Sequence, residues 1–395
     1  MIKIPVDIEA NKVAEFLDYL RLEIQFESGS QGEGSFKENG RFEEKVTGRL
    51  KGSRSEDGKV LFTITWNPDG TLAPICAEVD GKPPTNWEAL VQGWVHQALV
   101  GTVNAQRERF FFNYSLAYMG ALLDGEYYVS GFRLAPALYP DETAIWNERI
   151  VYLGLHAEGV DQQQAHELGR VEANRLTALL SCFLTTGFYS IPIEKRWILM
   201  GAGQSARYQL GFRKKDPPPD VMPKKGQLCP LGKFKAVDRS QLRIPCIEKR
   251  LQLPADIREL FRKYRNLATG EKEAFLGAAS LYRVALTAGR RYPTVRMAYE
   301  VAAVDALLRG NEHTQDAFVK LVQDLCPEAP EDILRHSYGS IRSAHFHGGE
   351  FPGGEYQPFH CGFFYGPQQL ERMNLPHAVG TIMWNALIRW LLLRT

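Results

Sequence analysis

The sequence FLGAASLYRVAL at residues 275–286 decides the fold of the C-terminal part of this chain. Its large apolar residues recur at the spacing that places them on one face of an α-helix. Similar helical patterns run from Leu253 almost to the C-terminus, with a break at the sequence RRYP of residues 290–293. We therefore expect an all-α domain over residues 251–395. Its helices are predicted near residues 257–261, 275–285, 295–308, 314–325, from about 331 into the 340s, and 377–393.

A proline-rich segment, KKDPPPD at residues 214–220, separates this domain from what precedes it. Three successive prolines cannot donate backbone hydrogen bonds, so a regular element ends there. The sequence thus predicts an N-terminal domain over residues 1–212, a connector over 213–250 and the helical domain over 251–395. The connector holds eleven Lys and Arg against four Asp and Glu. It is either a solvated linker or a surface that contacts nucleic acid.

Residues 1–212 mix the periods of helices and strands and carry a net charge of −7. KVLFTITW at 59–66 reads as a strand that enters a turn at NPDG, residues 67–70. The fold class is therefore α+β, with a mixed N-terminal domain followed by a helical bundle. Further expected elements are helices over 8–22, 87–99 and 161–184, strands over 71–79, 149–155, 196–200 and 206–212, and a flexible loop over 28–35.

Composition and charge exclude some classes of protein. The net charge of +1 argues against a general polyanion binder. Six scattered cysteines without a C-x-x-C pair, and an N-terminus without a long apolar run, predict a cytoplasmic location. The apolar run at 378–393 is too short for a transmembrane span and contains Gly380, Asn385 and Arg389, so we expect no membrane association.

The candidate site lies in SYGSIRSAHFHGG, residues 337–349. An arginine can hold a phosphate through a planar fork of donors, and a histidine can transfer a proton near neutral pH. On an ideal α-helix Arg342 and His345 share a face, whereas Arg342 and His347 point about 140° apart. If the helix ends at about Phe346, the glycines let the chain return His347 over the last turn. Alternatively, a second copy of the segment across a two-fold axis supplies the missing group.

The arginine, four residues, histidine and Gly-Gly at the end of a helical domain resemble the motif of the HEPN superfamily of ribonucleases, toxins and antiviral effectors. The likeness is to the Apea-like branch and covers roughly residues 250–395. Residues 275–286 look like the family helix that ends in Tyr-x-x-Ala-Leu. MAYEVAAVDALL at 297–308 resembles the helix that usually ends in Glu-x-Leu-Leu, and LPADI at 253–257 looks like the start of the domain.

The resemblance implies metal-independent RNA cleavage in which Arg342 and His347 match the motif's two catalytic residues. His347 would take the proton from a ribose 2′-OH, Arg342 would stabilise the pentacoordinate phosphate, and His347 of the partner subunit would protonate the leaving 5′-oxygen. The products would be a 2′,3′-cyclic phosphate and a 5′-OH. Two positions depart from the family pattern. Ser343 stands where nuclease members often carry Asn, Asp or His, and Asp305 replaces the usual Glu. Ser343 can still hydrogen-bond a phosphate or orient a neighbour, and the shorter Asp305 is expected to reach less far towards Arg342. Both are possible assisting residues of the site.

Further expectations concern partners and competing chemistry. The resemblance implies an RNA substrate and a homodimer with a composite site, in a prokaryotic antiviral defence or toxin system. The N-terminal domain would sense an unknown trigger or restrain the nuclease. The alternative is a catalytically inactive module that dimerises and binds RNA or nucleotide. His345 is either a helper of the site or a capping residue, and Tyr338 is expected to pack.

A metal site is the main competing chemistry at this motif. His345 and His347 form an H-x-H pair, and further possible zinc ligands lie nearby at His336, His360, Cys361 and His377. No acidic ligand stands at a diagnostic spacing. There is no phosphate-binding Walker loop and no glycine-rich dinucleotide turn. The sequence therefore predicts neither a metal nor a cofactor.

Overall fold

The computed structural model describes residues 1–26, 33–37, 40–49, 59–80, 85–104, 107–129, 131–136, 148–190, 196–200, 207–211, 251–308, 313–353, 355–356 and 367–394. Helices and antiparallel sheets occur together, so the predicted α+β class is confirmed. The chain forms two compact units. Unit 1 comprises Met1–Phe110 and Glu158–Leu168, and unit 2 comprises Phe111–Ala157 and Gly169–Thr395. The predicted connector, 213–250, lies outside the described residues.

Unit 1 is an antiparallel sheet with two helices packed on it. The sheet has the order β1 (Ile2–Ile4), β6 (Ile75–Asp80), β5 (Lys59–Trp66), β4 (Phe42–Arg49), β2 (Gln25–Phe26), and β3 (Glu33–Phe36) also pairs with β4. Val60, Phe62 and Ile64 alternate on the buried face of β5. They share a core with helices α1 (Val13–Glu23) and α2 (Trp87–Asn104), which therefore cover that face. A short 3-10 helix, η1 (Ala10–Lys12), precedes α1.

The predicted hairpin in unit 1 is confirmed. The backbone N–H of Gly70 donates to the carbonyl of Asn67 at 3.0 Å, and Gly70 has a φ of +83°, which glycine adopts without strain. β5 then pairs with β6 in antiparallel register. The expected loop over 28–35 is wrong at its C-terminal end, because residues 33–35 belong to β3 and pair with β4. The first five residues of that loop, Ser28–Gly32, lie outside the described residues.

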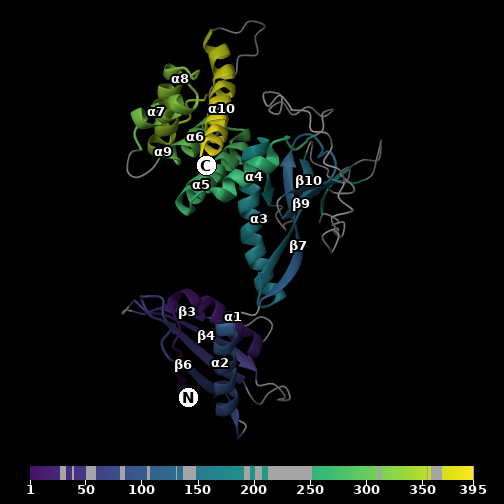
Figure 1. The fold of residues 1–395 in the computed structure, drawn as a ribbon, viewed down its shortest axis with the longest axis vertical. Helices are drawn as coiled ribbons and strands as arrows, with labels where there is room; N and C mark the ends of the chain where they lie inside the picture. The colour runs from purple at the N-terminus through teal and green to yellow at the C-terminus, as the bar shows by residue number, and fades with distance from the viewer. Residues whose placement is uncertain are drawn as a thin grey trace. The chain divides into compact units, whose positions relative to one another are not determined.

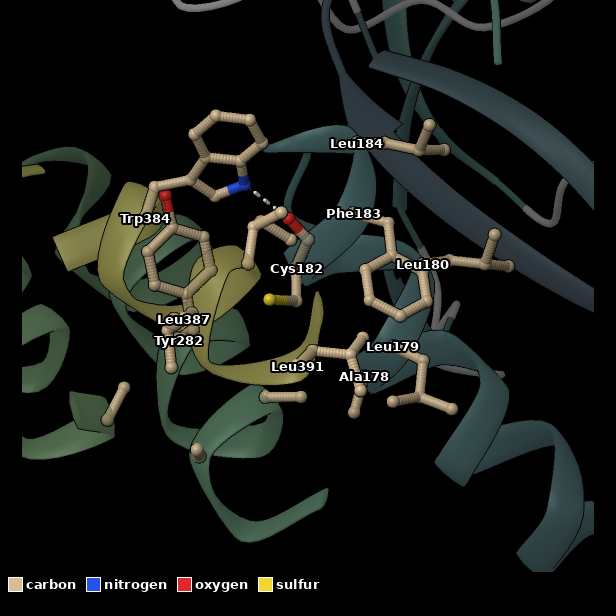
Figure 2. Packing of buried hydrophobic residues seen from close by; sticks show 14 of the residues in the cluster. Ala178, Leu179, Leu180, Cys182, Phe183, Leu184, Tyr282, Trp384, Leu387 and Leu391 are labelled. Atoms are coloured by element: carbon tan, nitrogen blue, oxygen red, sulfur yellow. Dashed lines mark hydrogen bonds between the residues drawn. The ribbon is translucent and has the colours of Figure 1, made fainter. Parts of the chain in front are cut away.

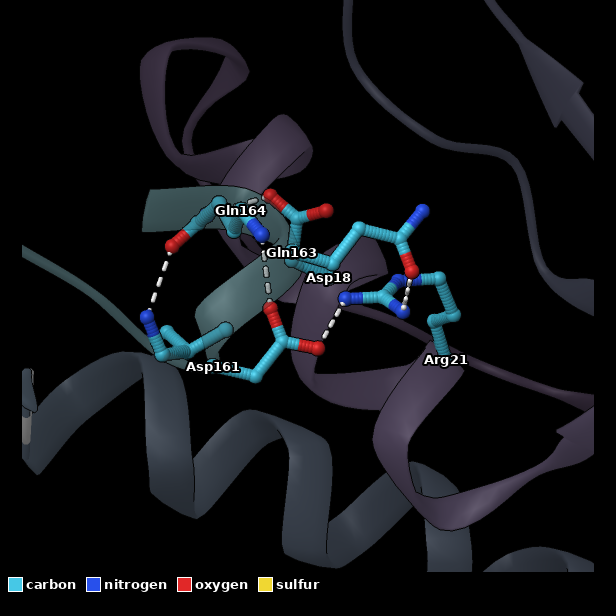
Figure 3. A network of polar contacts seen from close by, with 6 residues as sticks. Asp18, Arg21, Asp161, Gln163 and Gln164 are labelled. Carbon is cyan, nitrogen blue, oxygen red and sulfur yellow. Dashed lines mark hydrogen bonds and ion pairs between the residues drawn. The ribbon is translucent and has the colours of Figure 1, made fainter. Parts of the chain in front are cut away.

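A polar network in unit 1 joins α1 to the start of helix α3 (Gln162–Leu184). Arg21 forms an ion pair with Asp161 and donates to Gln163 Oε1 at 2.9 Å (Figure 3). Asp161 Oδ1 accepts the backbone N–H of Gln164 at 2.7 Å, which confirms Asp161 as the N-cap of α3. Gln164 also donates to Asp18.

Unit 2 contains the second sheet, ordered β11 (Tyr189–Ser190), β7 (Glu108–Met119), β10 (Glu148–Gly159), β9 (Phe132–Pro136), β8 (Tyr127–Val129). The part of α3 from Gly169 onward belongs to this unit, and its other helices follow from Ile257 onward (Figure 1). They are α4 (Ile257–Asn266), α5 (Thr269–Thr287), α6 (Pro293–Asp305), α7 (Gln315–Leu325), α8 (Glu331–His336), α9 (Ala344–Gly348) and α10 (Pro367–Leu393), with the 3-10 helix η6 (Ala288–Arg290) before α6 and the π-helix η7 (Ser337–Ser343) before α9. A separate hairpin pairs β12 (Arg196–Met200) with β13 (Arg207–Gly211).

The compact units do not follow the boundary predicted at residue 212. One hydrophobic core joins the second sheet, the C-terminal turns of α3 and the helices after residue 251. Phe183 of α3 packs edge-on against Phe261 of α4, with ring centroids 5.1 Å apart. Trp384 of α10 donates its indole N–H to the carbonyl of Cys182 at 2.8 Å (Figure 2). Because these buried contacts tie α3 to the helical bundle, the helices do not form a core of their own.

Candidate active site

The last residue of α6 is Asp305, and its side chain is only 6% exposed. A carboxylate at a helix C-terminus faces the negative end of the helix dipole, and burial removes its hydration. Asp305 therefore needs cationic partners or hydrogen-bond donors.

The candidate motif continues one helical run through α8, η7 and α9. Its central part is a π-helix, in which bonds span one residue more than in an α-helix. The carbonyl of Arg335, just before this segment, accepts from Gln315 Nε2 of α7 at 2.7 Å. A Cβ on Gly339 would lie 3.2 Å from the same Nε2, so glycine leaves room for this contact. Short π segments are frequent at functional sites.

Arg342 projects from η7 onto Asp305. Its Nη2 donates to Asp305 Oδ2 at 2.8 Å, and its side chain is 19% exposed. The guanidinium carbon also lies 4.9 Å from the ring centre of Tyr338 and 5.9 Å from that of Phe346. Asp305 therefore braces Arg342, although the shorter acid was expected to reach less far. Arginine is long enough to cover the distance that the shorter acid leaves.

The same carboxylate oxygen faces a histidine that the sequence analysis did not single out. His313 Nδ1 lies 3.5 Å from Asp305 Oδ2. The Tyr338 hydroxyl donates to the backbone carbonyl of His313 at 3.1 Å. Next in the chain, Thr314 caps α7 by accepting the N–H of Ala317 at 3.2 Å. The only sequence signal was this predicted helix start, which fixes where the preceding residue lies.

Two buried polar atoms of the Arg342–Asp305 pair have no hydrogen-bond partner in the described part of the chain: Asp305 Oδ1 and Arg342 Nε.

Tyr338 packs against Phe318 with ring centroids 5.0 Å apart, as its expected packing role requires. Burial, and next the negative charge of Asp305, raise the pKa of the Tyr338 phenol. The phenol therefore stays protonated as a donor at neutral pH.

The helical run ends at Gly348, two residues later than predicted. Gly349 adopts the left-handed conformation, with φ of +65°, and donates its N–H to the carbonyl of His345 at 3.0 Å. This is the αL form of a glycine stop. His347 lies in the last helical turn and is exposed, and no hydrogen bond or ion pair joins it to a described residue. Within the described part of one chain, therefore, no such contact unites Arg342 with His347.

Among the described residues, the two possible assisting residues of the motif, His345 and Ser343, make no ion pair with Asp305, unlike Arg342. His345 Nδ1 lies 3.1 Å from the carbonyl of Glu350, and its ring meets Phe351 edge-on at 5.2 Å. These contacts close the turn after the helix, which is the capping alternative for His345. Ser343 is half-buried in η7 and makes no side-chain cap for α9.

The chain after the motif is tied to the N-terminus of α6. Glu355 accepts the N–H of Thr294 at 2.5 Å and its hydroxyl at 2.9 Å. The Thr294 hydroxyl oxygen in turn accepts the N–H of Gly353 at 2.6 Å. A Cβ at Gly353 would lie 2.7 Å from that oxygen and 2.8 Å from the backbone nitrogen of Thr294, so a larger residue does not fit. The chain that follows the motif is thereby held against the N-terminus of α6.

The possible zinc ligands do not form a described site. His360 and Cys361 lie outside the described residues, and within the described ranges no three His, Cys, Asp or Glu side chains are grouped to hold a metal ion. In the same part of the chain, no helix has the length and apolar character needed to cross a membrane.

The site therefore consists of a buried carboxylate that holds an arginine and faces a histidine, with a second, exposed histidine at the end of the same helical run as the arginine. Comparison with known proteins adds no relative: no protein-family model, curated protein or solved structure matches this chain.

Proposed function

We propose that this protein is a metal-independent endoribonuclease of the HEPN type, with the helical part of unit 2 as its HEPN-like bundle. The observation that carries the proposal is the placement of Arg342. It is anchored on buried Asp305 and lies near two aromatic rings, while its side chain remains 19% exposed. Anchoring of this kind presets an arginine for binding a phosphate.

Arg342 keeps donors for a substrate after it binds Asp305. A guanidinium has five N–H groups in a rigid fork, and the hydrogen bond to Asp305 uses only one of them. Two N–H groups of such a fork can bind two phosphate oxygens at once. Arg342 would therefore stabilise negative charge as the pentacoordinate phosphate forms.

His347 supplies the proton transfer in this proposal. It takes the proton from a ribose 2′-OH, whose oxygen attacks the adjacent phosphorus, and cleavage leaves a 2′,3′-cyclic phosphate and a 5′-OH. Its exposure in the last helical turn suits access to a polymer substrate. Because His347 does not bind Arg342 within the described chain, we propose a homodimer in which two copies complete the site.

The remaining part of the chain forms a separate compact unit, unit 1. We propose that unit 1 senses a trigger or restrains the nuclease, as an effector of prokaryotic antiviral defence or a toxin requires.

Cleavage of single-stranded and structured RNA in EDTA tests the proposed function. The wild type should cleave, and His347→Ala or Arg342→Ala should each lower the rate by about 10²–10⁴-fold. His336→Ala serves as the control, because His336 is exposed on α8. EDTA-sensitive cleavage, or unchanged rates for both site variants, would contradict the proposal.

A second function is favoured by one contact. Since Arg342 is already hydrogen-bonded to Asp305, and no hydrogen bond or ion pair joins it to His347 among the described residues, the bundle can also serve as an inactive dimerisation module that binds RNA or nucleotide. RNA retention that survives Arg342→Ala, without cleavage in the presence of any trigger, would support this alternative.

A further inference from the structure

We propose that His313 is the acid that protonates the leaving 5′-oxygen during RNA cleavage, an inference that rests on the proposed function. It assigns a second proton-transfer group within the same chain as Arg342. The partner's copy of His347 is then not needed for this step.

Asp305 links the two side chains. One oxygen, Oδ2, lies 2.8 Å from Arg342 Nη2 and 3.5 Å from His313 Nδ1. Arg342 Nη2 and His313 Nδ1 are therefore at most 6.3 Å apart, which lets one phosphate linkage lie against both side chains. The carboxylate is nearly fully buried, whereas the His313 side chain is 45% exposed, so the ring stands between the buried charge and solvent.

The position of His313 is fixed through its backbone and its ring. Tyr338 holds its carbonyl, and the Thr314 cap fixes the start of α7 directly after it. Asp305 from α6 faces the ring, Tyr338 from η7 binds the backbone carbonyl, and Arg342 from η7 binds the same oxygen of Asp305. With Nδ1 directed to Asp305, the Nε2 edge remains for a substrate. A histidine oriented by a carboxylate is the usual arrangement for a general acid or base.

The proton balance of the step is complete. His347 takes the proton of the 2′-OH, the O2′–P bond forms, and Arg342 stabilises the charge on phosphorus. The P–O5′ bond then breaks, and the His313 imidazolium gives its proton to the 5′-oxygen. Afterwards His347 is protonated and His313 is neutral. Both side chains are exposed, so exchange with water restores them.

A leaving group that needs no proton tests this role. Two RNAs of the same sequence are compared, one with the ordinary 5′-oxygen and one with a 5′-bridging sulfur at the cleaved linkage, because a thiolate leaves without protonation. The variant His313→Asn keeps an N–H donor for Asp305 but has no proton to transfer. His336→Asn is the matched control on a helix next to the site. A second variant, His313→Gln, guards against a local folding defect.

We expect His313→Asn to slow cleavage of the oxygen RNA by about 10²–10⁴-fold. On the sulfur RNA it should cleave within a few-fold of the wild type, whereas His347→Ala should remain slow on both substrates. His336→Asn should behave as the wild type.

Three results would overturn the inference. Normal cleavage of the oxygen RNA by His313→Asn and His313→Gln, with Arg342→Ala inactive, would remove His313 alone and leave the proposed function standing. Equal losses on the oxygen and sulfur RNAs would assign His313 a structural role. Absence of cleavage by the wild type on both RNAs would overturn the proposed function and this inference together.

Discussion

Replacing Asp305 with alanine tests how the candidate site is held together. Removal of one partner from a buried ion pair strands the other charge and costs about 3–5 kcal/mol. Arg342 retains some solvent contact and the rings of Tyr338 and Phe346, so we expect the lower end, about 3 kcal/mol. At about 2–4 °C per kcal/mol for a domain of this size, the melting temperature should fall by about 6–12 °C.

Urea and thermal unfolding of the full chain measure this effect. Asp316→Ala is the control, because Asp316 also pairs with an arginine, Arg335, at 2.7 Å, but on the surface. We expect little change from it, since exposed pairs contribute little. A double-mutant cycle with Arg342→Ala would isolate the coupling between the two side chains. Asp305→Ala and Asp316→Ala with equal stabilities would refute the reasoning.

Three further predictions concern packing and charge. Gly353→Ala should lower stability by about 1–3 kcal/mol in urea unfolding, because the new methyl group meets Thr294 at 2.7 Å; an unchanged midpoint would contradict this. Gly277→Ala, in the middle of α5 with no atom within 4 Å of the new Cβ, should instead raise stability by up to about 1 kcal/mol, and a loss would show an unseen clash. Burial raises the pKa of Asp18, although its hydrogen bond from Gln164 opposes the shift. The stability contribution of Asp18 is thus present at acid pH and is lost as pH rises through its folded pKa, so Asp18→Asn should gain stability relative to the wild type between pH 3 and pH 7. A constant difference in urea midpoints over that range would refute it.

Local patterns predicted most of the individual elements. The hairpin of β5 and β6 followed from alternation and a turn that ends in Gly70, and α3 began at its predicted cap, Asp161. The break before α6 followed from Pro293, which stands at the helix start. In each case a few neighbouring residues determine the conformation, so sequence alone suffices.

The division of the chain could not be predicted in this way. The apolar residues at the end of α3, such as Phe183, show only that a face is buried. Their partners, including Phe261 and Trp384, lie roughly 80 to 200 positions later in the chain. Which distant surface covers a helix depends on tertiary packing, and a proline-rich segment between the two does not mark the limit of the core.

The site was predicted in part. The glycine stop was placed within two residues, and His345 has the capping contacts of one of its two expected roles. Ideal α-helical geometry does not predict the π-helical winding of η7, and the length of Asp305 alone does not predict the reach of Arg342 to it. His313 was not predicted because Asp305, Arg342 and His313 come from three different segments of the chain.

The end groups of the RNA products test the central claim most directly. Wild-type protein and the Arg342→Ala and His347→Ala variants are incubated with RNA in EDTA, and the fragments are analysed by mass spectrometry. The account predicts 2′,3′-cyclic phosphate and 5′-OH ends from the wild type, with their yield nearly abolished in both variants. Fragments with 3′-OH and 5′-phosphate ends, or cyclic phosphate ends produced equally by the variants, would contradict it.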